Sequence, residues 1–194
     1  MVPINVNTKW LDFGCGTGGL VCYLQQHAGC SVVGHEEGRL PRAIGRAVLS
    51  RKDLETMEGA FDVVSAIEVL EHAVDPVPLL RQMRRLLKPG GLLFITTGNA
   101  LPFRSRLLKW SYVVPEVHVS FFEPQTLALA LAHTGFRPEF RNCAGLADII
   151  RFKVLKNLGI RRVSFFERAL PWSVLCRLVE RRFHVSAHPV GWAV

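Results

Sequence analysis

The chain has 194 residues, of which 49% are hydrophobic, so a globular domain with a full core is expected and a disordered chain is excluded. Its formal net charge of +8 favours an anionic partner such as a nucleic acid, a membrane surface or an acidic substrate. Neither a transmembrane run nor a signal peptide is evident in the sequence. The five cysteines are odd in number and form no C-x-x-C pair, which is typical of reduced thiols in a cytosolic protein.

The first part of the chain has the pattern of a strand, a glycine loop and a helix. Residues 8–13 are predicted to form a buried strand that runs directly into the loop GCGTGG at 14–19. Residues 20–28 are predicted to form a helix, which Gly29 ends. Residues 31–35 then form a second strand. This arrangement indicates the start of a parallel sheet.

The alternation of helices and strands continues as far as residue 143. Asp75 is a good helix N-cap and Pro76 suits a first helical turn, while Pro89 and the two glycines after it are expected to end that helix. The other predicted elements are a helix at 39–46, strands at 47–49, 61–67 and 92–97, a helix at 124–134 and a strand at 136–143. Such an order predicts a mainly parallel sheet with helices on both faces. Residues 185–194 are expected to return to the sheet as an edge strand.

The glycine loop predicts a ligand site at the carboxyl ends of the strands. Gly14, Gly16 and Gly19 spell G-x-G-x-x-G, which permits a tight turn and a close backbone approach to a ligand. Glu36 ends the second strand, where a carboxylate can accept hydrogen bonds from both ribose hydroxyls of an adenosine. Glu37 is the neighbouring alternative. These features alone are also compatible with an NAD-dependent oxidoreductase.

Five segments taken together resemble the class I S-adenosylmethionine-dependent methyltransferases, especially the small-molecule branch related to ubiquinone-biosynthesis O-methyltransferases. They occur in the order and at roughly the spacings of that family, between residues 8 and 143. The segments are LDFGCGTGGL at 11–20, VVGHE at 32–36, FDVVSAIEVLEHAVDP at 61–76, LLKPGGLLFITTGN at 86–99 and HVSFFEPQTL at 118–127.

The resemblance implies a single domain with an α/β, Rossmann-like, doubly wound sheet of seven strands, the last of them antiparallel. It also implies S-adenosylmethionine as the cofactor, with Glu36 at the ribose, Asp53 at the adenine amino group and Glu68 at the methionine end. The loop that faces the methionine part would consist of Asp12, Gly14, Cys15, Gly16 and Gly18. Small size rather than thiol chemistry is the expected reason for a cysteine there.

The resemblance also leaves differences that motivate an alternative. Related enzymes usually have a helical segment before the first strand, whereas this strand begins almost at Met1, and the segment that contains Asp53 is hard to align. A catalytically inactive module that binds S-adenosylmethionine is therefore the alternative function, ahead of the NAD-dependent oxidoreductase.

Methyl transfer to a phenol or another hydroxyl requires a base, because the acceptor must lose a proton. Glu71, His72 and His118 are the candidates, and both histidines have the alternative interpretation of packing residues. Asn99 and Tyr112 are candidates for the acceptor pocket. The sequence shows no cluster with metal-ligand spacing, so no metal is expected.

Residues 145–183 are predicted to form a helical insertion that covers the acceptor side of the site. The segment has nine basic and three acidic residues, and Trp172, Leu175, Val179 and Phe183 share one helical face. The alternatives are a basic amphipathic surface for a membrane or a lipid-like acceptor, and an ordinary solvated face. A nucleic-acid partner is the least favoured, because exposed aromatic residues do not interleave with the basic ones. The expected partner is a small-molecule acceptor, in a cytoplasmic protein that can associate with a membrane.

Overall fold

The computed structural model describes residues 4–38, 48–110, 112–141 and 190–193. The predicted helix at 39–46, the whole of the predicted insertion at 145–183 and most of the predicted last strand lie outside these residues. The strands are β1 (Lys9–Phe13), β2 (Ser31–His35), β3 (Val48–Leu49), β4 (Phe61–Ile67), β5 (Leu87–Thr96), β6 (Pro138–Arg141) and β7 (Val190–Ala193). The helices are α1 (Gly19–His27), α2 (Arg51–Thr56), α3 (Pro76–Leu86) and α4 (Pro124–His133), with 3₁₀ turns η3 (Leu70–His72), η4 (Leu101–Phe103) and η5 (Leu107–Lys109).

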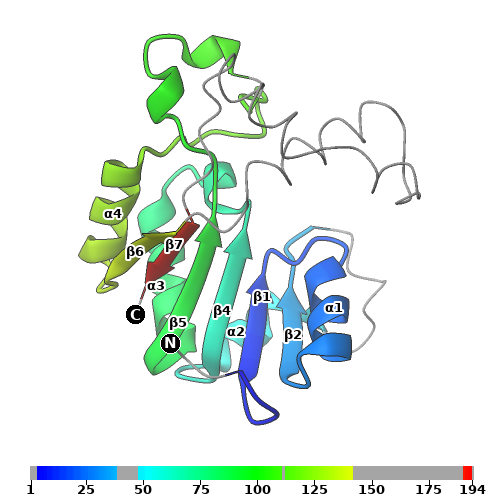
Figure 1. Ribbon diagram of the computed structural model, residues 1–194. Coiled ribbons are helices and arrows are strands. Elements are labelled where there is room, and N and C mark those ends of the chain that lie inside the picture. Colours follow the sequence, from blue (N-terminus) through cyan, green and yellow to red (C-terminus); the bar gives the residue numbers. More distant parts are fainter. Residues whose placement is uncertain (1–3, 39–47, 111, 142–189, 194) are drawn as a thin grey trace, which may run out of the picture. The chain divides into compact units, whose positions relative to one another are not determined.

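The strands form one sheet with the order β3-β2-β1-β4-β5-β7-β6 (Figure 1). The first five pair in parallel, so the carboxyl ends of β1, β2 and β4 meet at one edge of the sheet. β7 pairs antiparallel with both β5 and β6 and therefore lies between them, not at the edge that the sequence analysis predicted. The Rossmann-like α/β fold with a parallel sheet is confirmed.

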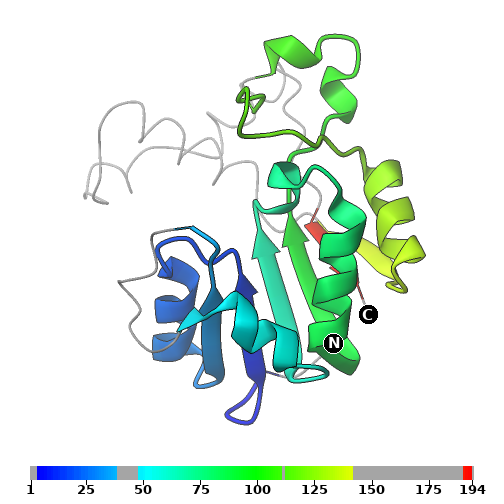
Figure 2. The same cartoon turned by 180° about the vertical axis from the view of Figure 1, so that it is seen from behind.

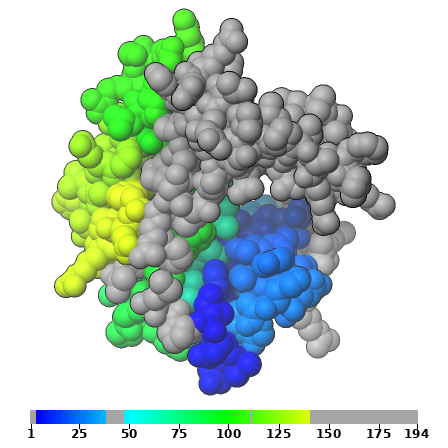
Figure 3. All heavy atoms as spheres, in the orientation of Figure 1, coloured from blue at the N-terminus to red at the C-terminus, as the bar shows by residue number. Residues whose placement is uncertain are grey.

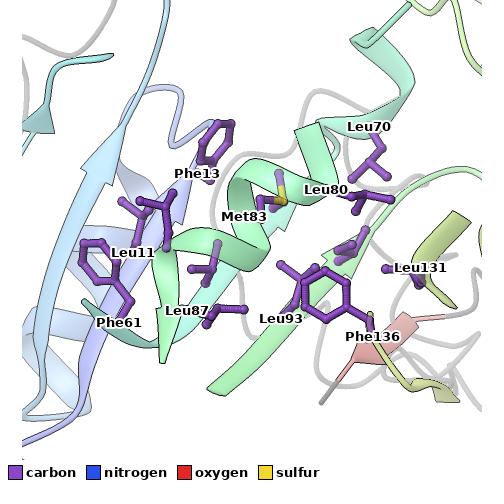
Figure 4. Packing of buried hydrophobic residues seen from close by; sticks show 14 of the residues in the cluster. Leu11, Phe13, Phe61, Leu70, Leu80, Met83, Leu87, Leu93, Leu131 and Phe136 are labelled. Atoms are coloured by element: carbon purple, nitrogen blue, oxygen red, sulfur yellow. The ribbon is translucent and has the colours of Figure 1, made fainter. Parts of the chain in front are cut away.

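Hydrophobic residues on the two faces of the sheet explain why helices cover both of them. Val21 and Leu24 of α1 pack with Val32 of β2 in one cluster. Leu80 and Met83 of α3 belong to a larger cluster with residues of β1, β4 and β5 (Figure 4). Figure 2 shows α2, α3 and α4 in front of the sheet, on the side away from the viewer in Figure 1.

The start of α3 follows the sequence prediction. The Asp75 carboxylate accepts a hydrogen bond from the Val77 amide at 3.0 Å, and Pro76 occupies the first helical position. The end of α3 and the start of β5 differ from the prediction. Phe61 pairs with Leu87, and the next paired residues are Val63 and Leu92, so the Pro89-Gly90-Gly91 segment is a bulge within β5 rather than a loop before it.

None of the helices that the structure describes is long and apolar enough to cross a bilayer. The outer side of α1, drawn in blue in Figure 3, is at the surface, as expected for a helix that buries only one face.

Candidate active site

A cavity of about 670 Å³ opens at the carboxyl ends of β1, β2 and β4. This is the edge of a parallel sheet at which ligands bind in doubly wound folds. Its wall is formed by the strand ends, the glycine loop and the first turns of α3. The residues that line it are Phe13, Gly14, Gly16, His35, Glu36, Glu37, Glu68, Val69, His72, Ala73, Val74, Asp75, Pro78, Leu79 and Gln82.

The glycine loop is held against the end of β2 by its backbone. The amides of Gly14 and Cys15 donate hydrogen bonds of 2.8 and 2.9 Å to the His35 carbonyl. Gly14 has a φ of +75°, and a Cβ there would lie 2.6 Å from Cγ2 of Val69. Gly16 has a φ of +51° and lines the cavity, with open space where a Cβ would lie. Glycine is therefore needed at 14 for space and at both positions for backbone conformation.

Glu36 is the acidic residue that the structure places beside the loop. Its Oε2 accepts from the Gly16 amide at 2.9 Å and its Oε1 from the Gly38 amide at 3.0 Å. A carboxylate has about four lone-pair positions, so two remain for a ligand. The side chain of Glu37, by contrast, is 67% exposed and its carboxylate lies 3.9 Å from the Arg51 guanidinium. Of the two acids, Glu36 is therefore the one that contacts the glycine loop.

Asp12 lies behind the loop rather than in the wall of the cavity. It is buried, and its Oδ1 accepts a hydrogen bond of 2.7 Å from the Ser65 hydroxyl, which in turn accepts from the Trp10 indole at 2.9 Å. Burial raises the pKa of the Asp12 carboxyl above its ordinary value, and the nearby Glu36 carboxylate adds to this effect. Ser65 was not predicted, although a polar residue in the apolar run FDVVSAI was a signal for it.

The Cys15 side chain points away from the cavity. It belongs to the cluster that α1 buries, and its Sγ lies 2.6 Å from the position that a Cβ on Gly34 would take. Burial raises the pKa of the Cys15 thiol to about 11, so the thiol stays protonated near neutral pH. Only the backbone of Cys15 contributes to the loop, consistent with the expectation that size is what matters there.

Asp53 has a different partner from the predicted adenine. Ser50 and Asp53 form a capping box at the start of α2, with the Ser50 amide and hydroxyl donating to Asp53 Oδ2 at 2.7 and 2.6 Å. The residue is not part of the cavity wall. The S-x-x-D pattern at 50–53 was the signal for this helix, which the sequence analysis did not predict.

Replacing Asp53 with alanine is therefore expected to destabilise the fold without affecting ligand binding. The Ser50 hydrogen bonds hold the pKa of Asp53 below its ordinary value, so its stabilising effect is present above the unfolded-state pKa and is lost as the pH falls through the folded-state pKa. Thermal unfolding should show a lower Tm at pH 7, with a difference that shrinks in acid. A large loss of S-adenosylhomocysteine affinity, relative to a Lys52→Ala control, would instead assign Asp53 to the ligand.

Two acidic residues after β4 meet at the Tyr112 hydroxyl. This hydroxyl lies 2.8 Å from Glu68 Oε2 and within hydrogen-bond distance of Glu71 Oε1, and it accepts from the Gly98 amide at 3.0 Å. Burial and the hydrogen bond to Glu71 raise the pKa of Tyr112, so it remains a phenol. Glu68 has a φ of +54°, a strained conformation that turns the chain at the strand end.

His72 and His118 lie with their rings edge to face, at a centroid distance of 5.0 Å. His72 Nδ1 is 2.8 Å from the Val117 carbonyl, and His118 Nδ1 is within hydrogen-bond distance of the Tyr112 carbonyl. A carbonyl oxygen only accepts, so both Nδ1 atoms carry the proton. In the neutral ring, Nε2 of each histidine then has a free lone pair that can take a proton or bind a cation.

Glu71 completes this cluster from a fully buried position. One ligand atom each from Glu71, His72 and His118 can be chosen so that all lie within 4.8 Å of one another. Two imidazoles and a carboxylate suit a divalent cation as well as proton transfer. The sequence analysis named these residues as possible bases but expected no metal, because no cluster with metal-ligand spacing was evident. Glu71 Oε2 accepts from the Thr97 hydroxyl at 3.0 Å and is held in place by it.

Tyr112 and Asn99, the sequence candidates for the acceptor pocket, lie in different surroundings. Tyr112 joins the Glu68 and Glu71 cluster, as described above. Asn99 instead accepts a hydrogen bond of 3.0 Å from the Leu101 amide and is not among the residues that line the cavity.

Comparison with known proteins identifies a methyltransferase domain in the chain. The family model for the methyltransferase domain matches residues 2–139. A ubiquinone biosynthesis O-methyltransferase of Pseudomonas aeruginosa is 37% identical to the chain, over 48% of this chain and 46% of the relative. The chain thus matches the curated relatives over about half of their length.

Solved structures show the same fold. An S-adenosylmethionine-dependent methyltransferase from Mesorhizobium loti has a TM-score of 0.65 at 18% identity, covering 99% of this chain and 93% of that one. A SAM-dependent methyltransferase from Archaeoglobus fulgidus has a TM-score of 0.62 at 20% identity, with 98% and 87% covered.

Proposed function

The chain belongs to the methyltransferase domain family, and from this premise we propose that it transfers the methyl group of S-adenosylmethionine to an oxygen atom of a small-molecule acceptor. The observation that carries the proposal is one cavity lined both by the glycine loop with Glu36 and by Glu68 and His72, the second of which is a candidate base. A binding site for the methyl donor and groups able to take a proton are therefore side by side.

The residues present fit this cofactor. Glu36 keeps two lone-pair positions for ribose hydroxyls after it binds the Gly16 and Gly38 amides. Gly16 lines the cavity, and within the described part of the chain no atom lies within 4 Å of the place that a Cβ would take there, so the loop backbone can approach a ligand closely. The apolar side chains of Phe13, Val69 and Leu79 line the same cavity and suit a nucleoside.

In such a reaction the chain does not have to activate the methyl group. When bound, S-adenosylmethionine supplies an already activated methyl group on a sulfonium. The chain must align the acceptor, exclude water and remove the hydroxyl proton. Nε2 of His118 or His72 is the expected proton acceptor, since each ring is oriented by a hydrogen bond at Nδ1. Glu71 would stabilise the imidazolium that results.

A cation held by Glu71, His72 and His118 is the second way in which this cluster could act. It would lower the pKa of an acceptor hydroxyl without a protein base. Chelation separates the two roles. If turnover is lost in EDTA and returns with a divalent cation, the cluster holds an ion; if turnover is insensitive to EDTA, the histidines act as bases.

Oxygen as the acceptor atom is supported by the name of the Pseudomonas aeruginosa relative, an O-methyltransferase. We extend the proposal to a seven-stranded sheet with an antiparallel last strand, which the pairing of Leu93 with Ala193 supports. Contact of the basic segment at 145–183 with a lipid-like acceptor or a membrane, and a cytoplasmic location, are parts of the same proposal.

The test is transfer of a labelled methyl group from S-adenosylmethionine to a panel of phenols, catechols, amines and RNA. Label is expected in hydroxyl compounds and not in amines or RNA. Transfer to amines or RNA alone would reject the proposed acceptor. If the cofactor binds but no acceptor is labelled, the chain is the inactive binding module instead.

A change at Glu36 is expected to weaken the cofactor specifically. Glu36→Gln removes the negative charge that receives the ribose hydroxyls, and hydrogen bonds to charged groups contribute about 1.5–3 kcal/mol, so S-adenosylhomocysteine should bind roughly 10- to 100-fold more weakly. Isothermal titration measures this. Glu37→Gln is the matched control and should leave the affinity nearly unchanged. An equal effect of both substitutions would argue against Glu36 as the ribose acid.

A further inference from the structure

Tyr112 contacts three residues to which the proposed function gives different roles. Its hydroxyl is 2.8 Å from Glu68 Oε2, an acid at the cofactor cavity, and within hydrogen-bond distance of the buried Glu71 Oε1. The same oxygen accepts a hydrogen bond of 3.0 Å from the Gly98 amide. The carbonyl of Tyr112 accepts from Nδ1 of His118, a candidate base. One residue therefore joins the cavity acid, the buried acid and the base.

The ring of Tyr112 can take this place because Gly98 has no side chain. A Cβ on Gly98 would lie 2.6 Å from Cδ1 of the ring and closer still to Cε1, so any larger residue would displace the ring. The ring also stacks on the indole of Trp110, at a centroid distance of 4.7 Å and an interplanar angle of 23°. Trp110 is buried and stacks in turn on Phe103. Packing as well as hydrogen bonding thus holds Tyr112.

His118 is oriented by Tyr112 through two contacts. The centroids of the two rings are 4.5 Å apart, with an angle of 44° between their planes. The hydrogen bond to the Tyr112 carbonyl keeps the proton on Nδ1, so Nε2 is the atom that can take a proton or bind a cation. The place of Tyr112 therefore determines where Nε2 of His118 points, whichever of these two roles the histidine has.

The two acids depend on the Tyr112 hydroxyl to different degrees. Glu71 is fully buried, and its carboxylate accepts from the hydroxyls of Thr97 and Tyr112. A buried carboxylate is costly unless hydrogen bonds compensate for the lost water. Glu68 is exposed, and its Oε1 is also held by the Thr96 hydroxyl at 3.0 Å. Loss of the Tyr112 hydroxyl should therefore affect Glu71 more than the cavity acid.

We propose that Tyr112 is a positioning residue for the methyl transfer, which holds the imidazole of His118 and the carboxylate of Glu71 in their working orientation. The inference rests on the proposed function and deepens it. The phenol is not the base itself, because burial and the hydrogen bond to Glu71 raise the pKa of Tyr112 and keep it protonated. Its effect on the reaction passes through His118.

The first test is Tyr112→Phe, which keeps the ring and the carbonyl but lacks the hydroxyl. We expect kcat to fall about 10- to 100-fold, as for one hydrogen bond to a charged group, while the affinity for S-adenosylhomocysteine changes less than about threefold. The same substitution added to His118→Asn should lower kcat little further, because Tyr112 acts through His118. Tyr23→Phe, at the exposed tyrosine of α1, is the matched control and should keep the wild-type kcat.

A second readout needs no turnover. In a chain labelled at the histidine nitrogens, the proton on Nδ1 of His118 should give an NMR signal that exchanges slowly with water, assigned by its loss in His118→Asn. In Tyr112→Phe this proton should exchange at least about tenfold faster, because the carbonyl that accepts it is less firmly held. Gly98→Ala keeps every polar side chain but displaces the ring, so the same faster exchange is expected there.

A Tyr112→Phe chain that keeps either the wild-type kcat or the wild-type proton exchange overturns the proposal. An undiminished loss of kcat when Tyr112→Phe is added to His118→Asn overturns it as well, because Tyr112 would then act independently of His118. Failure of the wild type to transfer a methyl group would contradict the proposed function alone. The exchange of the Nδ1 proton would still decide whether Tyr112 holds His118.

Discussion

Gly16→Arg is expected to abolish the binding of S-adenosylmethionine, with affinity reduced at least about 100-fold. Gly16 lines the cavity and has open space around it, so an arginine side chain there would occupy the volume that the cofactor needs. It would also place a positive charge beside a sulfonium cation. Isothermal titration with S-adenosylmethionine and S-adenosylhomocysteine measures the loss.

A control is needed because Gly16 has a positive φ, which strains any L side chain. Gly59 offers a close match: its φ is +56°, against +51° at Gly16, and it also has open space around it. Gly59 lies before β4 and does not line the cavity. Gly59→Arg should therefore lower stability to a similar extent and keep cofactor affinity. Similar losses of affinity in both variants would mean that strain, not occupation of the cavity, is responsible.

His118→Asn is expected to lower kcat by roughly 10²- to 10⁴-fold, the contribution typical of a catalytic acid or base. The asparagine amide can still donate to the Tyr112 carbonyl, as Nδ1 of His118 does, so the local fold should persist. The variant lacks Nε2, the atom that would take the acceptor proton. Steady-state kinetics with an acceptor identified by the labelling panel provides the measurement.

Cofactor affinity distinguishes this effect from general damage to the site. Titration of His118→Asn with S-adenosylhomocysteine should give nearly the wild-type affinity, because His118 is not among the residues that line the cavity. The matched control is His27→Asn, a histidine at the end of α1 whose ring stacks on Tyr23, and kcat should be unaffected there. Wild-type turnover by His118→Asn would exclude His118 from the reaction.

The features that could be predicted from the sequence are those that depend on local patterns. The bounds of β4 agree with the structure because this strand is a mostly apolar run of strand length, and the bounds of β2 agree as well. The loop at 14–19 and Glu36 were identified because glycines after one strand and an acid at the end of the next strand both lie at the carboxyl edge of a parallel sheet. The N-cap at Asp75 was predicted from an equally local pattern, an aspartate directly before a proline.

The features that were missed depend on contacts between distant segments. Tyr112 reaches Glu71 across 41 residues, and His118 lies against His72 only because the chain after β5 folds back over η3. The position of β7 between β5 and β6 is likewise a matter of topology that residue patterns do not specify. His35 was predicted as a strand residue, but its unpaired Nε2 depends on the carbonyl of Leu49, in another strand.

The most direct test of the proposed cofactor site is a crystal structure of the chain with S-adenosylhomocysteine. The account predicts density in the cavity at the carboxyl ends of β1, β2 and β4, with both ribose hydroxyls within hydrogen-bond distance of Glu36. The homocysteine part should lie toward Gly14 and Glu68. Density for the ligand in another place, or a ribose directed away from Glu36, would contradict the account.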